Sequence, residues 1–339
     1  MEDKYRKYPH YVPIVKWQKW ERRALLETDA TVAKRVLPCI EVRDSSQHTQ
    51  MLSEYDSTWK GPGLVDYADP DGFLPTPRLA ELIAFLSQGS GSSLQASPVL
   101  SPYAAPATLT SVKKVLAGRQ MTLRVRIDDV ETASSHLPAL QKFMARPQAA
   151  GCVDRLLVDL GRTPTLTNTQ IKSFASILTI FKAIGFEHVH LASGAFPNTL
   201  AHISGAGEVE RLDWTLWTDI AAATPKLLLG FSDYGPLTPE WSEATLTRRG
   251  GRSAIRYALD DKWRVIRGAS NQKSESIAIS ELMVQVYASE FKGKRYSFGD
   301  LLIDERADPL IFDSAKRCGH YHISEFWSHH IAFVVKDQY

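Results

Sequence analysis

The feature that most constrains this chain is a regular alternation of short β-rich runs with helical patterns over its first 235 residues. Eight runs are predicted to be strands, and a polar residue stands near the end of each. Successive polar residues are separated by 25 to 40 positions, a spacing typical of strand–loop–helix units. The runs are Tyr11–Trp17, Val36–Val42, Gly63–Tyr67, Ala96–Leu100, Met121–Ile127, Arg155–Leu160, His188–Ala192 and Leu227–Phe231.

Eight such units in about 250 residues match the size of a (β/α)8 TIM-barrel-like fold of the α/β class. A doubly wound open sheet is the alternative, but no glycine-rich phosphate-binding fingerprint follows the first strand. Helices are expected at 20–35, 78–86 and 169–184; the last begins after a Thr/Asn cap and stops at Gly185. We therefore expect a barrel-like domain over residues 8–245.

Residues 246–339 show a different pattern, which predicts a C-terminal α+β elaboration packed on or completing the barrel. The segment RSAIRYALDDKWRVIRG predicts a hairpin that turns at Asp260 and Asp261. A helix is predicted over Glu275–Phe291, and a terminal strand over Ile331–Lys336.

Composition places the chain among globular proteins and narrows its partners. Hydrophobic residues make up 44% of the chain, charged residues 23%, and the formal charge is +2. A general electrostatic attraction to nucleic acid is therefore not expected. Three cysteines are too few for a disulfide framework, and no secretory signal or membrane-spanning run is evident. We expect a cytoplasmic protein with no membrane partner.

A series of short motifs occurs in a recognisable order. They are YVPIVKWQKWE near the start, RVLPCIEV, LRV at 123–125, LLVDLG, RYALDDKWRVIRG, YSFGD at 296–300 and a terminal HHIAFVV. In this order they resemble the phage Beta-protein family, which is found in tailed phages and bacterial genomes. The resemblance runs from about residue 8 to residue 336.

The resemblance implies a barrel-like α/β fold and a link to phages, mobile elements or phage defence. It implies no established reaction, and so it assigns no catalytic residue. One segment departs from the family's pattern, because CGHYHISEFWSHH stands where a Gly-Asn-rich segment usually precedes the terminal His-His.

The polar groups at the strand ends are the strongest candidates for a functional site. In a barrel the carboxyl ends of the strands meet at one mouth, where several carboxylates could bind Mg²⁺ or Mn²⁺. Lysine and arginine there could stabilise a phosphoryl group during phosphoester hydrolysis of a nucleotide or nucleic acid. The candidates are Glu41, Asp66, Asp159 and Asp233 as metal ligands or general base, with Lys16 and Arg126 as catalytic cations. Alternatively, these groups are ion pairs that close the barrel interior.

Histidines suggest a second, less favoured site that would bind Zn²⁺. His188 and His190 would share one face of a strand, and Cys318-x-His320-x-His322 repeats the spacing. In the common barrel hydrolases a His-x-His ends the first strand, whereas here that strand carries Lys16. The alternative is that these histidines are exposed loop residues.

Arginines interleaved with aromatic residues in the predicted hairpin suggest contact with phosphates or nucleic acid. In a strand Arg264 and Arg267 would fall on opposite faces, so the group cannot form one patch. A solvated hairpin is the alternative. The candidate contact residues are Arg256, Tyr257, Arg264 and Arg267, within a run that also contains Arg248, Arg249 and Arg252.

In the motif YSFGD, Ser297 or Asp300 is expected to cap a helix that begins near Leu301, with Gly299 in a left-handed turn. A function of another class stays open beside the hydrolase, namely a non-catalytic interaction component of a phage-related system with an unknown protein partner. The two differ at the barrel mouth, since an enzyme needs carboxylates that are unpaired and open to solvent.

Overall fold

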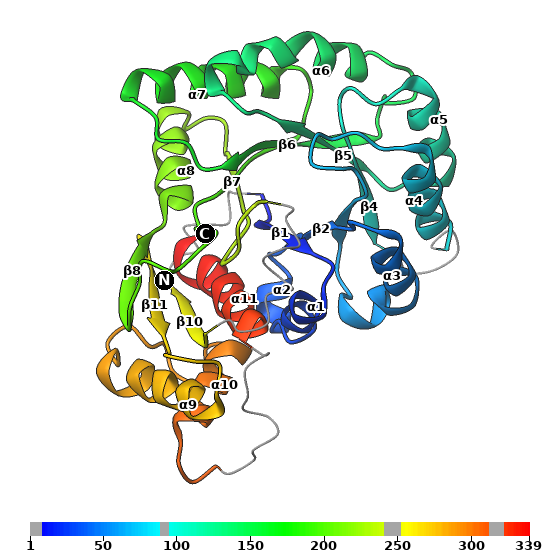
Figure 1. The fold of residues 1–339 in the computed structure, drawn as a ribbon. Helices are drawn as coiled ribbons and strands as arrows, with labels where there is room; N and C mark the ends of the chain where they lie inside the picture. Colours follow the sequence, from blue (N-terminus) through cyan, green and yellow to red (C-terminus); the bar gives the residue numbers. More distant parts are fainter. Residues whose placement is uncertain (1–8, 89–94, 241–251, 312–321) are drawn as a thin grey trace. The chain divides into compact units, whose positions relative to one another are not determined.

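The computed structural model describes residues 9–88, 95–240, 252–311 and 322–339 (Figure 1). These residues form two compact units. Of the described residues, the first unit comprises 9–17, 36–88, 95–194 and 213–234, and the second comprises 18–35, 195–212, 235–240, 252–311 and 322–339. The second unit therefore also includes segments that precede residue 246.

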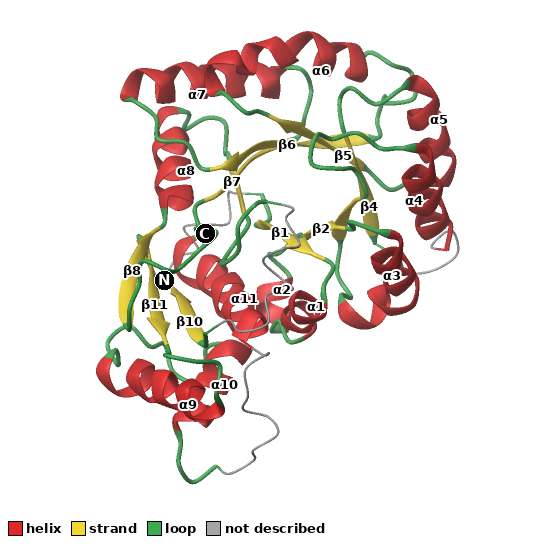
Figure 2. Ribbon diagram, viewed as in Figure 1, coloured by secondary structure: helices red, strands yellow, loops and turns green. Residues whose placement is uncertain are grey.

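The first unit is a closed barrel of eight parallel strands within the described ranges, which confirms the predicted fold class. The strands follow one another around the barrel in chain order, and β9 closes the ring by pairing with both β7 and β1. Helices lie outside the strands (Figure 2). The strands are β1 (Val12–Lys16), β2 (Cys39–Glu41), β3 (Gly63–Asp66), β4 (Ala96–Leu100), β5 (Met121–Arg126), β6 (Val153–Arg162), β7 (His188–Gly194) and β9 (Gly230–Asp233).

The helices of this unit follow the strands as the sequence predicts, with cap residues at several starts. Asp44 accepts a hydrogen bond from Gln47 at the start of α3, and Thr167 forms a capping box with Gln170 at the start of α7. The helices are α3 (Ser45–Thr58), α4 (Thr76–Gln88), α5 (Pro106–Val115), the 3-10 helix η1 (Val130–His136), α6 (Leu137–Met144), α7 (Asn168–Ala183) and α8 (Leu212–Ala223).

The strand register brings the polar strand ends to the same level of the barrel. Lys16 on β1 is in register with Glu41 on β2, and Glu41 is in register with Asp66 on β3. On the other side of the ring, Arg126 on β5 is in register with Asp159 on β6. Because side chains alternate along a strand, residues two positions before these groups face the same interior.

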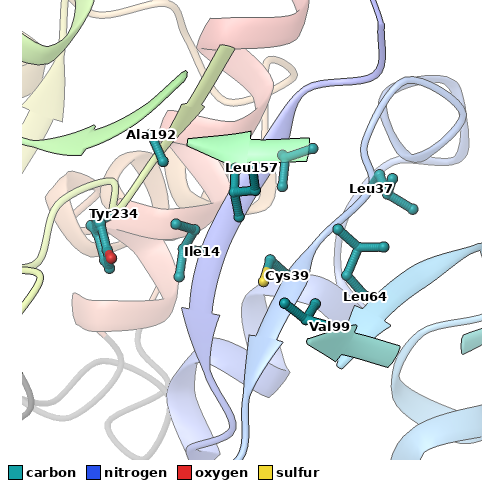
Figure 3. Close-up of a cluster of buried hydrophobic side chains, with 9 residues drawn as sticks. Ile14, Leu37, Cys39, Leu64, Val99, Leu157, Ala192 and Tyr234 are labelled. Atoms are coloured by element: carbon teal, nitrogen blue, oxygen red, sulfur yellow. The ribbon is translucent and has the colours of Figure 1, made fainter. Parts of the chain in front are cut away.

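An apolar layer fills the barrel interior at that earlier level. Ile14, Cys39, Leu64 and Leu157 belong to one buried cluster, and each stands two residues before a polar strand end. Figure 3 shows these side chains, which come from β1, β2, β3 and β6, directed into the same space. Burial raises the pKa of the Cys39 thiol, which keeps it protonated. Apolar side chains therefore fill the barrel interior directly below the polar groups, so the polar groups do not line an open channel.

The second unit contains a three-stranded antiparallel sheet in the order β10–β11–β8. The hairpin of β10 (Ala254–Ala258) and β11 (Lys262–Arg267) confirms the sequence prediction. The third strand, β8 (Ala206–Glu210), is polar and short, and the sequence did not indicate it. One face of the hairpin, through Ile255 and Ile266, packs on a cluster that includes α9 (Lys273–Glu281) and α10 (Phe298–Ala307).

The predicted strand Ile331–Lys336 is wrong. These residues end helix α11 (His322–Phe333) and continue into a π-helical turn, η4 (Val334–Gln338). The segment from Ile331 to Val335 is buried throughout, and a short apolar run that is buried on all sides has no periodicity to separate strand from helix.

Two predicted helices also differ in detail. The helix expected over residues 20–35 is broken into α1 (Lys19–Leu26) and α2 (Ala30–Ala33), because Asp29 caps a new helix start. The helix expected over Glu275–Phe291 is α9 followed by a π-helical turn, η3 (Leu282–Val286).

In YSFGD, Ser297 is the N-cap of α10, as predicted, and its hydroxyl also donates to Asp300 at 2.5 Å. The predicted left-handed turn at Gly299 is wrong. Gly299 lies inside α10, and a Cβ there would stand 2.2 Å from the carbonyl oxygen of Glu325. The glycine is needed for this close helix approach, since any side chain would collide with backbone.

Candidate functional site at the carboxyl end of the barrel

The centre of the polar layer is Arg124 on β5, a residue whose side chain is 1% exposed. Its Nη1 donates to Oδ2 of Asp66 at 2.7 Å, and its Nε and Nη2 donate to Oδ2 of Asp159 at 3.0 and 2.7 Å. Nη1 also lies 3.0 Å from Oε1 of Glu41. One guanidinium therefore joins three carboxylates from three other strands.

Tyr234, directly after β9, completes this cluster. Its hydroxyl accepts from Nη2 of Arg124 at 2.7 Å and donates to Oδ2 of Asp159 at 2.8 Å. Burial, with Asp159 alongside, raises the pKa of Tyr234, so its hydroxyl keeps the proton that it donates. We call Arg124, Glu41, Asp66, Asp159 and Tyr234 the Arg124 cluster.

The surroundings favour the ionised forms of Asp159 and Arg124. Burial alone would raise the pKa of Asp159, but Arg124 and Arg126, with hydrogen bonds from Gly161 and Tyr234, hold it below its ordinary value. Burial works against the charge of Arg124 as well, yet the surrounding acidic groups raise its pKa well above the ordinary value. Within the described ranges, neither carboxylate oxygen of Glu41 has a hydrogen-bond partner. Glu41 contacts Arg124 through the ion pair alone.

The structure brings together five of the six sequence-predicted barrel residues at one end of the interior. Glu41, Asp66 and Asp159 belong to the cluster, and Lys16 is buried in register beside Glu41. Arg126 lies above them, with Nη2 3.6 Å from Asp66 and Nε 4.0 Å from Asp159. Its side chain is 17% exposed, which makes it the more accessible of the two β5 arginines.

Asp233 does not join this group. It accepts a hydrogen bond at 2.6 Å from the hydroxyl of Tyr11, whose ring stacks on Phe231. Asp233 ends β9 between Ser232 and Tyr234. Tyr234 belongs to the cluster inside the barrel, so alternation along the extended chain places Asp233 on the outer face of the strand.

Arg124 and Tyr234 are the members of the site that sequence reasoning missed. Arg124 stands in the middle of a strand rather than at its end, and it reaches the polar layer because an arginine side chain is long. The alternation of Thr122, Arg124 and Arg126 on β5 was the available signal, since it places all three residues on one face.

A pocket of about 330 Å³ opens beside the cluster, between the loops that follow β3 and β4. Ala68, whose backbone N–H donates to Oδ1 of Asp66 at 3.0 Å, lines it. Gly72 and Ser101 also line it, and a Cβ on Gly72 would stand 3.0 Å from Nη1 of Arg126. The guanidinium of Arg126 therefore lies next to the pocket wall.

The arginines predicted to contact nucleic acid in the second unit are held by intramolecular partners. Arg264 pairs with Glu290 at 2.6 Å and with Glu208 at 2.7 Å, and Arg267 donates to backbone carbonyls of Leu200 and Ile203. Arg248 and Arg249 lie outside the described residues, whereas Arg252 is described and exposed.

The other two predicted contact residues are also engaged. Arg256 donates to the carbonyl oxygen of Pro236 at 2.7 Å, and its guanidinium lies 4.6 Å from the ring centroid of Phe196. Tyr257 donates to Oδ1 of Asp300 at 2.5 Å and is buried. The structure does not gather these four side chains into one surface, and their contact with phosphate stays a prediction.

The histidines are placed in different surroundings. His190 is buried in the barrel, where its Nε2 lies 3.0 Å from the carbonyl oxygen of His10 and burial holds its pKa well below the ordinary value. His322 is buried on α11, 3.3 Å from Glu325. Cys318 and His320 lie outside the described residues. Within the described ranges, no group of three or more His, Cys, Asp or Glu side chains is arranged to hold a metal ion.

A comparison with protein-family models decides the affiliation. The model of the family described as Beta protein matches residues 11–336, nearly the whole chain. The chain belongs to the Beta protein family. The barrel, its Arg124 cluster and the antiparallel sheet are thus features of a Beta protein family member.

Among curated proteins, no match to this Beta protein family member is found. It resembles the biosynthetic arginine decarboxylase SpeA from Campylobacter jejuni with 11% identity and a TM-score of 0.39, over 97% of this chain and 56% of the decarboxylase. It resembles a chitinase from Chromobacterium violaceum with 10% identity and a TM-score of 0.33, over 83% and 91% of the two chains. The chain spans little more than half the length of the decarboxylase, and neither likeness bears on its activity.

No helix in the described ranges has both the length and the apolar character that crossing a bilayer requires.

Proposed function

We propose that this Beta protein family member binds a phosphate-containing ligand at the carboxyl end of its barrel, with Arg126 as the cation that faces the ligand. The observation that carries this proposal is that the two arginines on β5 have different surroundings. Arg124 is buried and paired with Glu41, Asp66 and Asp159, whereas Arg126 is partly exposed and lies 3.6 Å from its nearest carboxylate. A guanidinium matches the fork of phosphate oxygens, so Arg126 suits such a ligand.

Hydrolysis of a phosphoester with the help of Mg²⁺ or Mn²⁺ is the catalytic form of this proposal. Glu41, Asp66 and Asp159 would be the ligands or the general base, and Lys16 and Arg126 would stabilise the phosphoryl charge. Such a cation would have to compete with the guanidinium of Arg124 for the same oxygens. Asp233 is left out, because it points to the outer face of β9 with Tyr11 as its partner.

A non-catalytic role as an interaction component is the second candidate. The pairing of three carboxylates with Arg124 favours it, since an enzyme that used these groups would keep them open to solvent. The resemblance of the motifs suggests that either role serves phages or phage defence. The small number of cysteines suggests a cytoplasmic setting for both roles. An unknown protein partner belongs to this second candidate.

Thermal unfolding of the whole chain separates these possibilities. A ligand that binds the folded state at a hundredfold excess over its Kd stabilises it by about 2.7 kcal/mol. We expect inorganic phosphate or a short phosphorylated compound to raise the Tm without a divalent cation, and Arg126→Gln to abolish the rise.

Two other outcomes would change the conclusion. A rise that needs Mg²⁺ or Mn²⁺ and is lost in Glu41→Gln and Asp66→Asn would favour the hydrolase, and phosphatase and nuclease assays would follow. No rise with any phosphate compound would contradict ligand binding and leave the interaction component.

A further inference from the structure

The pocket beside Arg126 has the architecture of a small-molecule site. It lies where the loops that follow β3 and β4 meet, on the face of a barrel where enzymes of this fold bind their ligands. Its volume of about 330 Å³ falls at the lower end of the range for ligand pockets. Apolar side chains, among them Leu74, Val99 and Leu100, form much of its lining, with a few polar groups between them.

One side of the pocket is suited to an anion. Gly72 and Ser101 line that side, and a Cβ on Gly72 would stand 3.0 Å from Nη1 of Arg126, which places this guanidinium beside the lining. The first turn of α5 also lines the pocket through Ala105 and Thr108. Ala105, the N-cap of this ten-residue helix, has no side chain that could accept from the first N–H groups. The positive end of the helix and Arg126 therefore act on the same space.

The rim of the pocket carries two exposed aromatic rings. Phe73 is 65% exposed and Tyr103 is 60% exposed, and both line the pocket. Packing within the barrel gives no reason to expose two large rings at one opening, whereas a planar ligand could stack on them.

Hydrogen bonds hold the turn that carries Phe73 and the ring of Tyr103. Asp69 fixes the turn that carries Phe73, because its Oδ1 accepts from the N–H of Phe73 at 2.8 Å while its own N–H donates to the carbonyl of Phe73 at 2.9 Å. The hydroxyl of Tyr103 lies 2.6 Å from Nδ1 of His136. A rim that is ordered before binding loses little entropy when a ligand stacks on it.

We propose that this pocket receives the heteroaromatic ring of a phosphorylated ligand, so that the barrel binds a nucleoside monophosphate with its base at Phe73 and Tyr103 and its phosphate at Arg126. The exposed carboxylate of Asp71 and the hydroxyl of Ser101 supply an acceptor and a donor for the polar edge of a base. The inference rests on the proposed function, because it takes Arg126 as the phosphate-binding cation.

Isothermal titration calorimetry on the full chain tests the inference with four classes of probe. These are the monophosphates AMP, GMP, CMP and UMP, the matching nucleosides, ribose 5-phosphate and inorganic phosphate. We expect at least one monophosphate to bind about tenfold or more tightly than ribose 5-phosphate. Phe73→Ala and Tyr103→Ala should remove that advantage and leave the affinity for ribose 5-phosphate unchanged.

Matched variants separate stacking from other effects. Tyr103→Phe keeps the ring and its edge contact with His136 and loses only the hydrogen bond to Nδ1, so it should retain most of the advantage. Ile180→Ala removes a 47% exposed apolar side chain from α7 and should change no affinity. Arg126→Gln should weaken every phosphorylated probe and leave any nucleoside binding in place.

Failure of this inference is distinguishable from failure of the proposed function. Equal affinity for monophosphates and ribose 5-phosphate, or aromatic variants that bind every probe like the native chain, would overturn the base site while phosphate binding stands. Absence of binding by all phosphorylated probes would overturn both. Binding of a polymeric single-stranded DNA with no binding of any monophosphate would assign the rim to nucleic acid instead.

Discussion

Nη2 of Arg124 and Oδ2 of Asp159 lie 2.7 Å apart, and these side chains are only 1% and 2% exposed. The pair joins β5 to β6 in the middle of the barrel, and the same guanidinium continues to Glu41 and Asp66. Removal of one partner of such a buried ion pair lowers the free energy of unfolding strongly, because the other charge stays buried without a partner. The cluster is therefore first a structural element, and Arg126, the residue proposed to face a ligand, is the more exposed arginine beside it.

Arg124→Met should destabilise the barrel strongly. It leaves three buried carboxylates without their common cation, and loss of one partner of a buried pair costs about 3–5 kcal/mol. Urea unfolding followed by tryptophan fluorescence would measure the loss. Arg126→Gln is the matched control on the same strand and should cost about 1 kcal/mol or less, since its ion pairs are longer and partly solvated. Equal losses in the two variants would contradict the assignment of Arg124 as the centre.

Gly72→Ala should weaken phosphate binding more than it weakens the fold. Gly72 has φ of +81°, where alanine is strained by about 1 kcal/mol, and the new Cβ would stand 3.0 Å from Nη1 of Arg126. The guanidinium of Arg126 would have to move by a few tenths of an ångström from its present position. Calorimetry with inorganic phosphate and urea unfolding should be compared. Gly118→Ala is the control, because Gly118 has φ of +83° with open space around it and should lose stability alone.

Glu325 makes the stability of the second unit sensitive to acid. Burial opposes its charge, but Arg306 and His322 lower its pKa from 4.5 to about 2. A carboxyl group whose pKa is lower in the folded chain stabilises the fold. This contribution is complete at pH values above 4.5, the pKa in the unfolded chain, and it is lost as the pH falls toward 2. The contribution is on the order of 3 kcal/mol.

Glu325→Gln tests this contribution. We expect the variant to be less stable than the native chain near neutral pH, because Arg306 then lacks its carboxylate partner. The difference in free energy of unfolding between the native chain and the variant should become smaller as the pH falls below about 4. Urea unfolding at a series of pH values would show it, and a constant difference over the whole acid range would refute the role of Glu325.

Gly299→Ala should destabilise the second unit, although alanine is the better helix former. The Cβ would stand 2.2 Å from a backbone oxygen of Glu325, and backbone cannot move aside as a flexible side chain can. We expect a loss of about 1–3 kcal/mol, the cost typical of overpacking. Glu305→Ala on the same helix should cost much less. A stabilised Gly299→Ala variant would show that α10 and α11 do not approach so closely.

The barrel could be predicted because its signal is repeated. Eight runs with similar spacing tolerate errors of a few residues in each, and even the last strand, which begins at Gly230 rather than Leu227, keeps its place in the order. The level of the polar strand ends could also be predicted, because parallel strands finish at one edge of the ring.

The pairing within the site could not be predicted, because it depends on side-chain reach and on which face each residue takes. Asp233 and Tyr234 are neighbours in sequence, and a shift of one position decides that the tyrosine and not the aspartate faces the interior. The pocket was missed for another reason. Phe73 and Tyr103 stand in loops, where neither periodicity nor strand ends give a signal.

The Arg124 cluster also bears on how the chain reaches its native state. Its hydrogen bonds join residues 35, 58 and 110 positions apart in sequence, so no local segment can assemble it. Contacts of such separation form late, after loop-closure entropy has been lost. Arg124 can contact all its partners only when the ring of strands is closed in the correct register. The cluster therefore stabilises the completely closed barrel, and incompletely closed intermediates lack its ion pairs.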